Sequence, residues 1–366
     1  MAGSTYGNIF KITTWGESHG KALGVVVDGC PAGLSLTEED VQAYLNRRKP
    51  GASRFATPRK EDDAVEILSG VFEGKTTGTP ISMMVRNKDH HSADYSKIAS
   101  YYRPGHADYT FDEKYGFRDY RGGGRSSGRE TIGRVAGGAI AAKILKELGI
   151  TISTYVTSIG PISIAQNRFD LNEAKNNELN MPDKVAAQEA AAYLESLIKE
   201  KNSAGGTVEC MVQGLPTGLG DPVFEKLDAG LAKAIFSIGA VKGFEIGDGF
   251  AAAHATGADN NDAFGIGADG NVIKKTNHSG GTLGGISDGS PLILRAAFKP
   301  TPSIASPQET VNKNGEEITI EIAGRHDPLI AARGVVVVEA MTALTLVDAL
   351  FANASARMDT LKKIYE

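Results

Sequence analysis

The chain has 366 residues, of which 41% are hydrophobic and 23% charged, and a chain of this length forms either two lobes or one large elaborated domain. Its formal net charge of −5 disfavours a nucleic-acid-binding or membrane-surface protein, so any anion site must be local. No apolar run approaches the roughly 20 residues of a membrane span, no secretory signal is visible, and Cys30 and Cys210 lack metal-site spacing, so we expect reduced cysteines and a cytoplasmic location.

The expected elements are strands where β-branched residues concentrate and helices where apolar residues recur every three or four positions. A capping-box pattern, Ser35-x-x-Glu38, opens the first helix, and Gly149 suits the C-cap of the second. In chain order they are strand 24–30, helix 37–48, strand 81–86, helix 131–148, strand 150–158, helix 183–199, strand 206–213, helix 223–238, strands 292–298, 317–322 and 335–338, and helix 339–357.

The strand pattern predicts the fold class. Residues 317–322 alternate between polar and apolar, which favours a sheet with one covered face and therefore antiparallel pairing. The alternation of strands and helices is too irregular for a doubly wound parallel sheet. We therefore predict an α+β layered sandwich.

Four long stretches between these elements show little periodicity. Loops of that length inside a compact domain are usually functional or disordered. These are rich in Gly, Arg, His and Ser, which favours ordered function. They are residues 49–64, 87–128, 257–289 and 299–314.

The segment from Arg103 to Arg134 carries the strongest local signal. It holds arginines at 103, 118, 121, 125, 129 and 134, the glycines 122–124, and then Ser126 and Ser127 just before the helix expected at Thr131. Guanidinium groups, hydroxyls and the free amides of a helix N-terminus together form a cradle for anions. A solvated surface loop or an RGG-like nucleic-acid tract is the alternative, but such tracts are usually repetitive. The segment also lacks the Gly-Lys-Ser/Thr ending of a nucleotide-binding P-loop.

A second basic cluster lies at Arg47, Arg48, Lys49 and Arg54, with Arg59 and Lys60 beyond it. Basic residues in the last turn of a helix are common because they interact favourably with the helix dipole. Residues 54 and 59 fall outside the helix. Taken alone, the cluster fits an anion site and a solvated face equally well.

Two histidines are candidates for proton transfer. His19 lies in a turn between Gly16 and Gly20, and His106 follows Pro104-Gly105. A histidine near arginines and a phosphate is a natural proton donor, although a hydrogen-bonded structural role is the more frequent one for a lone histidine. The adjacent pair at positions 90 and 91 cannot easily share one metal, so we expect no metal site.

The C-terminal third adds three glycine turns that carry a cation, a hydroxyl or a carboxylate. They are residues 277–285, 299–303 and 324–328. Asp327 is a candidate base, and a turn-forming aspartate before proline is the alternative. The repeated combination of glycine turns and cations implies more than one anionic ligand.

Three of these motifs, read together, resemble the signatures of the chorismate synthase family. They are Thr14–Gly20, Arg103–Thr110 and Gly123–Thr131. The resemblance covers essentially the whole chain in order. It continues through residues 28–29, 47–54, 68–74, 240–243, 245–250, 277–285, 299–303 and 324–328.

The resemblance implies one domain over residues 1–366, a β-α-β sandwich and a homotetramer. It also implies a carbon–oxygen lyase that eliminates phosphate from 5-enolpyruvylshikimate 3-phosphate in a 1,4-anti sense to give chorismate. That reaction is the last step of the shikimate pathway, and it requires reduced FMN without net redox change. A substrate with two carboxylates and a phosphate, beside the FMN phosphate, suits a concentration of arginine.

The resemblance also assigns roles by position. His19 would protonate the departing phosphate, His106 would protonate the reduced flavin, and Asp327 would assist removal of the ring proton at flavin N5. Arg48, Arg129 and Arg134 would bind substrate. Arg48 with Arg54 matches a pair linked to NADP, and the same pair could equally hold the substrate phosphate. The residues expected at FMN are Arg125, Ser126, Ser127, Gly239, Ala240, Gly284, Lys299, Pro300, Thr301, Pro302, Ser303 and Arg325.

Two departures from the family pattern concern flavin contacts. Gly239 stands where relatives often have a larger residue, and Pro302 where a serine is common. The chain leaves no room for a reductase domain, so we expect a separate flavin reductase as electron source, with NADPH the candidate reductant. A nucleic-acid-binding protein and a non-catalytic phosphosugar-binding protein are the competing hypotheses. The second leaves His19 and Asp327 unexplained.

Overall fold

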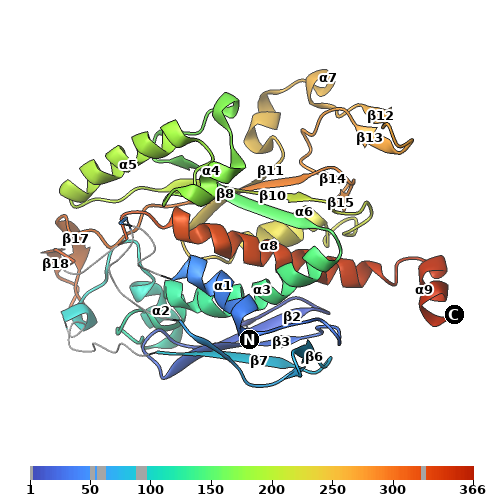
Figure 1. Cartoon of the computed structure of the whole chain (residues 1–366). Coiled ribbons are helices and arrows are strands. Elements are labelled where there is room, and N and C mark those ends of the chain that lie inside the picture. Colours follow the sequence, from blue (N-terminus) through green and yellow to red (C-terminus); the bar gives the residue numbers. More distant parts are fainter. Residues whose placement is uncertain (1–2, 50–53, 56–62, 88–96, 323–326) are drawn as a thin grey trace.

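The computed structural model describes residues 3–49, 54–55, 63–87, 97–322 and 327–366. Two five-stranded sheets enclose a layer of helices, with α1, α3 and α8 between them (Figure 1). Every strand pair within these two sheets is antiparallel. The predicted α+β layered sandwich is therefore confirmed.

The first sheet contains the N-terminal strands in the order β1-β2-β3-β7-β4. Along β3, the side chains of Leu23, Val25 and Val27 are at most 1% exposed and face the helix layer. The strands are β1 (Thr5–Tyr6), β2 (Lys11–Gly16), β3 (Ala22–Asp28), β4 (Val65–Ile67) and β7 (Ile81–Arg86).

The second sheet has the order β11-β16-β10-β8-β9, and its inward face carries the other half of the core. Helices α4 (Leu171–Asn176) and α5 (Lys184–Lys199) lie on its far side (Figure 1). Its strands are β8 (Thr151–Ile159), β9 (Ile162–Ser163), β10 (Gly206–Gln213), β11 (Val241–Ile246) and β16 (Leu292–Phe298).

The helix layer depends on close approach between α3 and α8. A Cβ added at Gly138 of α3 would lie 2.3 Å from the Cβ of Ala340 in α8, and one at Gly137 would lie 2.7 Å from Ile12 of β2. Glycine therefore lets α3 touch both a helix and the first sheet. The helices are α1 (Glu38–Arg48), α3 (Thr131–Glu147), α6 (Leu227–Phe236) and α8 (Ala331–Asn353).

Helix α8 is long and apolar enough to cross a membrane by length and composition, but 72% of its most apolar window is buried inside the protein. It is accordingly the central helix of the core, in contact with α1, α3, α6 and two strands of the second sheet.

Smaller elements decorate the sandwich. Helix α2 (Asp108–Tyr115) lies inside the long arginine-rich segment, and α7 (Gly257–Asn260) and α9 (Met358–Tyr365) lie toward the C-terminus. The hairpin strands are β5 (Val71–Phe72), β6 (Lys75–Thr76), β12 (Phe264–Ile266), β13 (Val272–Lys274), β14 (Thr282–Leu283), β15 (Ile286–Ser287), β17 (Gln308–Val311) and β18 (Glu317–Ile320).

Most predicted elements are confirmed within two residues, but the strand predicted at residues 335–338 is wrong. Those four valines lie within α8, which begins at Ala331 rather than at 339 and ends at Asn353 rather than at 357. Their β-branched side chains are buried on all sides of a core helix, and this packing overrides their strand propensity. The helix predicted at 223–238 is shorter, because it begins at Leu227 and ends at Phe236.

The first helix begins as predicted but by a different cap. The amide of Thr37 donates to the Asp40 carboxylate at 2.9 Å, so the capping box is formed by these two residues and not by Ser35 and Glu38. Strands β2 and β11 and helix α2 were not predicted. Cys30 and Cys210 are buried and unbridged, and burial raises their thiol pKa to about 11 and about 12.

Candidate active site

The His19 turn rests on the triple glycine of the arginine-rich segment. A Cβ added at Gly122 would lie 2.0 Å from Cε1 of His19, so only a glycine permits this contact. Ser18, which is buried, bonds Nδ1 of His19 at 3.1 Å and donates to the carbonyl of Gly122 at 3.2 Å. Two motifs that are distant in sequence are therefore in direct contact.

Asn87 joins this turn to an arginine. Its side-chain amide donates to the carbonyls of Glu17 and Gly20 at 3.0 and 2.8 Å, and its Oδ1 accepts from Nη2 of Arg129 at 2.8 Å. Because both carbonyls need a donor and the guanidinium needs an acceptor, the amide orientation is determined. Asn87 directly follows strand β7, so the first sheet positions the bridge.

Arg129 and Arg48 share one buried carboxylate. Asp63 lies 3.2 Å from Nη2 of Arg129 and 2.5 Å from Nη2 of Arg48. Arg48 is 2% exposed and Asp63 is 3% exposed. Burial lowers the pKa of the Arg48 guanidinium, and the charge of Asp63 opposes that effect.

Asp327 lies in the same cluster. Its carboxylate accepts a hydrogen bond from Nη1 of Arg333, and Nε of Arg333 donates to the backbone carbonyl of Arg48 at 3.2 Å. The charge of Asp327 raises the pKa of the Arg48 guanidinium, and the charge of Arg333 lowers it. The candidate base is therefore beside a candidate substrate-binding arginine, although 279 residues separate them in sequence (327 − 48).

His106 lies where two loops meet. Its Nε2 is 2.8 Å from Oγ of Ser303, and its Nδ1 is 2.9 Å from the carbonyl of Pro104. Burial, with Arg103 adding to it, lowers the pKa of His106 to about 4. The imidazole is therefore neutral at pH 7 in the ligand-free chain, and a nearby anion would raise its pKa.

The loop at residues 299–303 connects His106 to Asp327. Thr301 donates to the backbone carbonyl of Asp327 at 2.6 Å, and Nζ of Lys299 donates to the carbonyl of Gly105 at 2.7 Å. The ring of Pro302 packs so closely on Gly105 that an added Cβ there would lie 2.7 Å away. The proline at position 302, where a serine is common in the family, therefore fits because residue 105 is a glycine.

Two of the predicted flavin residues lie beside this loop. The amide of Lys299 donates to the carbonyl of Ala240 at 2.9 Å, and Ala240 has φ +72. A Cβ added at Gly239 would meet no atom of the described residues within 4 Å, so glycine leaves open space beside them. Burial and the charge of Lys242 lower the pKa of Lys299.

Arg125, Ser126 and Ser127 are all hydrogen-bonded to other residues of the chain. The guanidinium of Arg125 donates to the carbonyl of Gly16 at 3.1 Å and to Oγ1 of Thr14 at 2.6 Å. Ser126 donates to Gly123 at 2.7 Å, and Ser127 caps the short 3₁₀ turn that precedes α3. This segment therefore lies against strand β2, next to the His19 turn.

The arginines 48, 129 and 333 and the aspartates 63 and 327 are called the Asp63 cluster below. Four other predicted residues lie apart from this cluster or outside the described residues. Arg134 bonds Glu130 at 2.8 Å and Ser237 at 2.5 Å, which places it beside the turn that leads to Gly239. The side chain of Arg54 is 60% exposed and pairs with Glu195 at 3.0 Å. Gly284 lies in the β14–β15 turn beside the N-terminus of α6, whereas Ala240 follows its C-terminus. Arg325 lies outside the described residues, as do Arg59, Lys60, His90, His91 and His326.

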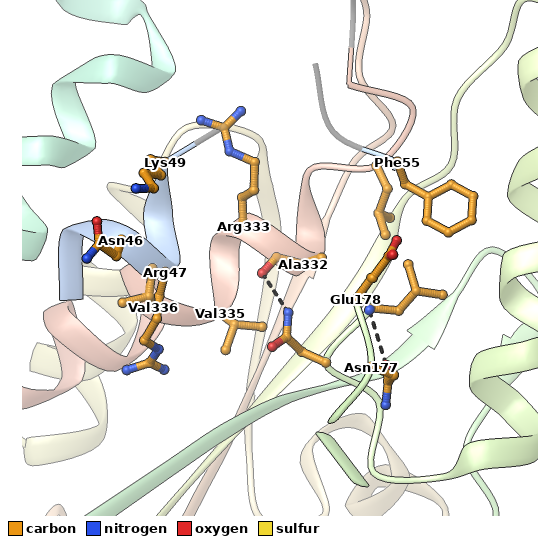
Figure 2. Close-up of a pocket in the computed structure, with 13 residues that line it drawn as sticks. Asn46, Arg47, Lys49, Phe55, Asn177, Glu178, Ala332, Arg333, Val335 and Val336 are labelled. Atoms are coloured by element: carbon orange, nitrogen blue, oxygen red, sulfur yellow. Dashed lines mark hydrogen bonds between the residues drawn. The ribbon is translucent and has the colours of Figure 1, made fainter. Parts of the chain in front are cut away.

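A cavity of about 340 Å³ lies on the other side of Arg333, between the end of α1 and the first turns of α8 (Figure 2). Its lining combines polar side chains, among them Arg47, Lys49 and Arg333, with the apolar Val335 and Val336. Figure 2 shows Arg333 and Lys49 on the same side of the cavity. Neither His19 nor His106 lines it, whereas Arg333 both lines the cavity and holds Asp327.

The Asp63 cluster suits an anionic ligand. It contains the arginines 48, 129 and 333 and the aspartates 63 and 327, which leaves one positive charge in excess. Nε of Arg48 is buried and donates to no acceptor among the described residues. A buried guanidinium donor without an acceptor is costly unless a ligand supplies one.

Sequence reasoning missed four residues of this site: Ser18, Asp63, Asn87 and Arg333. Each holds a predicted residue by a hydrogen bond or an ion pair. Ser18 was next to a candidate histidine in a glycine turn, which is a usable signal. The other three had no local pattern to distinguish them.

Comparison with known proteins gives a consistent result. A family model described as chorismate synthase matches residues 10–351. The chain is similar to proteins named chorismate synthase from Agathobacter rectalis, at 71% identity, and Lachnospira eligens, at 69%, each covering 100% of both chains. It is also similar to a solved structure titled "Crystal Structure of Chorismate Synthase", with 32% identity, a TM-score of 0.78, and coverage of 98% of this chain and 97% of that one.

Proposed function

This chain belongs to the chorismate synthase family, and from that premise we propose that the His19 turn, the Asp63 cluster and the His106 loops form one active site. The enzyme is a carbon–oxygen lyase that eliminates phosphate from 5-enolpyruvylshikimate 3-phosphate to form chorismate, the last step of the shikimate pathway. The assignment of residues within that reaction is the proposal.

The observation that supports one site is a series of contacts joined by one loop. The contacts run from the His19 turn through Asn87 and Arg129 to Asp63, Arg48, Arg333 and Asp327. The 299–303 loop then bonds Asp327 through Thr301 and His106 through Ser303. Three candidate catalytic side chains from different parts of the sequence are thereby held by one network.

We assign the anionic groups of the substrate to Arg48 and Arg129. Both guanidiniums are mostly buried, and Arg48 retains a donor that no described residue uses. Guanidinium groups in a water-poor site stabilise charge that accumulates on a leaving phosphate. Arg134, which the structure places beside Ser237, stays a prediction as a substrate ligand.

We assign the proton-transfer roles from the family resemblance. His19 lies on the Gly122–Gly124 turn and donates a proton to the departing phosphate, while Asp327 assists removal of the ring proton. A positioned acid or base of this kind contributes about 10²- to 10⁴-fold to a rate. His106 becomes cationic only when a neighbouring anion offsets the burial that lowers its pKa.

Residues of this chain fit reduced FMN. Lys299 to Ser303, Gly239 and Ala240 would hold it, because they combine a cation, hydroxyls and open backbone near His106. The Arg125–Ser127 segment, beside the His19 turn, would add a further cation and two hydroxyls. Reduced FMN, when bound, supplies electron density that helps the phosphate leave. Gly284 and Arg325 stay predictions as flavin contacts.

The source of electrons is the second part of the cofactor proposal. We infer that a separate flavin reductase supplies them, with NADPH as the reductant. The match of Arg48 and Arg54 to an NADP-linked pair stays a prediction. Arg54 is exposed at the surface beside Phe55, whose ring it covers at 4.7 Å. An anaerobic assay with NADPH as sole reductant, with and without an added reductase, tells whether a separate reductase or this chain itself reduces the flavin.

We further propose one domain, a homotetramer and a cytoplasmic location. A single hydrophobic cluster extends from Phe10 to Val347 and so joins both sheets. Large apolar side chains are exposed on several peripheral elements, which subunit contacts would cover. The buried, unbridged cysteines suit a reducing compartment.

The test of the function is phosphate release under anaerobic conditions with reduced FMN. We expect chorismate and phosphate in equal amounts, and no phosphate release would contradict the assignment. His19→Ala and His106→Ala are expected to reduce kcat by at least about 10²-fold while each still binds FMN. Unchanged rates in both variants would remove the proposed roles of these histidines.

A further inference from the structure

Arg333 links two residues of the proposed site, Asp327 and Arg48. It lies in the first turn of α8, where its amide donates to the carbonyl of Ile330 at 3.0 Å. Its Nη1 donates to the carboxylate of Asp327, and its Nε donates to the carbonyl of Arg48 at 3.2 Å. One guanidinium therefore contacts both the candidate base and the backbone of a candidate substrate ligand.

Asp327 is restrained at two points. Its carboxylate is held by Arg333, and its backbone carbonyl accepts from Thr301 at 2.6 Å. The Asp327 side chain is 14% exposed and that of Arg333 is 26% exposed, so both groups are largely withdrawn from water. In such a setting an ion pair fixes geometry more firmly than it does on an open surface.

Both contacts can form at once because of the shape of the arginine side chain. The planar guanidinium offers donors in a rigid fork, so Nη1 and Nε can serve two acceptors at fixed directions at the same time. A lysine at 333 would keep a positive charge near Asp327 but has no second rigid donor for the carbonyl of Arg48. The two contacts therefore depend on different properties of the side chain.

We propose that Arg333 is a positioning residue that aligns the Asp327 carboxylate with the substrate held by Arg48. The inference rests on the proposed roles of Asp327 and Arg48. Arg333 does not touch substrate or cofactor in this role, because it acts through the carboxylate and the backbone of α1. Its other side lines the 340 Å³ cavity, which gives it space to move if Asp327 is removed.

The experiment compares Arg333→Gln, Arg333→Lys, Asp327→Asn and the double variant Arg333→Gln/Asp327→Asn in the presence of reduced FMN. We expect Arg333→Gln to lower kcat by about 10²-fold with KM changed by less than about threefold, because a misplacement of 1 Å has that effect on a reacting group. Arg333→Lys should recover part of the loss. The isotope effect with substrate deuterated at the ring carbon that loses its proton should rise in Arg333→Gln.

The double variant is the decisive arm. If Arg333 acts through Asp327, the double variant is no slower than Asp327→Asn alone, since the residues function as a unit. Multiplicative losses would overturn the inference. So would a fall in kcat/KM that comes from KM alone, which would make Arg333 a binding residue.

Two controls separate this inference from its premise. Arg168→Gln removes a similar arginine from the buried carboxylate of Asp183, which caps helix α5, and should leave kcat and the isotope effect unchanged. Substrate affinity, measured calorimetrically with oxidised FMN so that no turnover occurs, should be the same in Arg333→Gln and the parent. If Asp327→Asn turns over normally, the proposed role of Asp327 fails and the inference fails with it. If only Arg333→Gln turns over normally, the inference alone fails.

Discussion

At the scale of single residues, shared carboxylates explain how the chain can bury several arginines together. Asp63 contacts both Arg48 and Arg129, and Asp327 contacts Arg333. Burying one unpaired guanidinium would be strongly unfavourable, whereas a hydrogen-bonded pair offsets much of that penalty. The single excess positive charge then remains available to an anion.

The first residue-scale prediction concerns His106 and pH. Its folded-state pKa of about 4 is below the unfolded value of 6.5, so on acidification the unfolded chain takes up this proton first. The parent should therefore lose about 1–2 kcal/mol of unfolding free energy from this group between pH 7.5 and pH 5. In His106→Gln that part of the loss should disappear, as measured by urea denaturation at the two pH values. An equal loss in parent and variant would show that His106 is not the group responsible.

The second residue-scale prediction concerns Asn87. Asn87→Ala removes the bonds to the His19 turn and to Arg129, so kcat/KM should fall by about 10- to 10²-fold and stability by about 1–3 kcal/mol. Asn177→Ala is the matched control, because its amide also braces a loop, through the carbonyls of Glu173 and Met181. Asn177→Ala should lower the melting temperature without a comparable loss of activity. Equal activity losses in both variants would contradict a specific role for Asn87.

The residues of the site were predicted unevenly for a physical reason. Arginines and histidines in glycine-rich turns stand out in a sequence because that combination has few structural uses. Asp63 and Arg333 lie in ordinary surroundings, and their importance comes only from contacts across the fold. A carboxylate that balances distant arginines leaves no local pattern.

At the scale of elements, glycines set the spacing of the central layer. Gly138 of α3 is in contact with Ala340 of α8. A Cβ added at Gly230 of α6 would have just Thr345 within 4 Å among the described residues, at 3.6 Å. Both are interior helix positions, so an alanine would gain similar helix propensity at either site, about 1 kcal/mol. The difference between the two positions is the available space.

This contrast gives a paired prediction. Gly138→Ala should destabilise the protein by about 1–3 kcal/mol, because α3 and α8 must move apart, while Gly230→Ala should be neutral or stabilising by up to about 1 kcal/mol. Denaturant unfolding of both variants measures the difference. If Gly138→Ala were as stable as Gly230→Ala, the close helix contact would not be a constraint.

Element prediction failed where burial was complete. The alternation in β16 gave that strand its correct bounds, because it has a covered and a less covered face. Val335 to Val338 lie in a helix that is buried around most of its circumference, so there is no periodicity to read. Composition then indicated a strand, and packing decided otherwise.

At the scale of the whole molecule, exposed apolar side chains indicate further association. In the β12–β13 hairpin, Phe264, Ile266 and Val272 are 61%, 71% and 68% exposed. A soluble protein rarely leaves such residues together in water unless a partner covers them. We take the hairpin as a contact in the proposed homotetramer.

The corresponding prediction is that Ile266→Glu/Val272→Glu dissociates the tetramer into smaller species in sedimentation velocity experiments. Charges buried at a subunit contact without partners would oppose association strongly. Circular dichroism should show unchanged secondary structure, because both side chains are exposed within one chain. A variant that still sediments as the parent does would exclude this hairpin from the subunit contacts.

The overall layering could be predicted from the sequence, but the way the ends of the chain meet could not. The carboxylate of Asp348, in α8, accepts from the amides of Ile9 and Phe10 at 2.7 and 3.0 Å. Nothing in either segment signals the other, because the contact depends on the path of all the chain between them.

That contact has a consequence for synthesis. The start of the first sheet is held by a residue that the ribosome adds 338 positions after Phe10, and α8 fills the space between the two sheets. A nascent chain therefore leaves the tunnel with the sides of α1, α3 and the second sheet that face α8 uncovered, and contacts over such distances form slowly. Any copy that stops before α8 lacks Arg333 and the central helix of its core. A cell making this enzyme must shield the emerging chain until its last tenth has been translated.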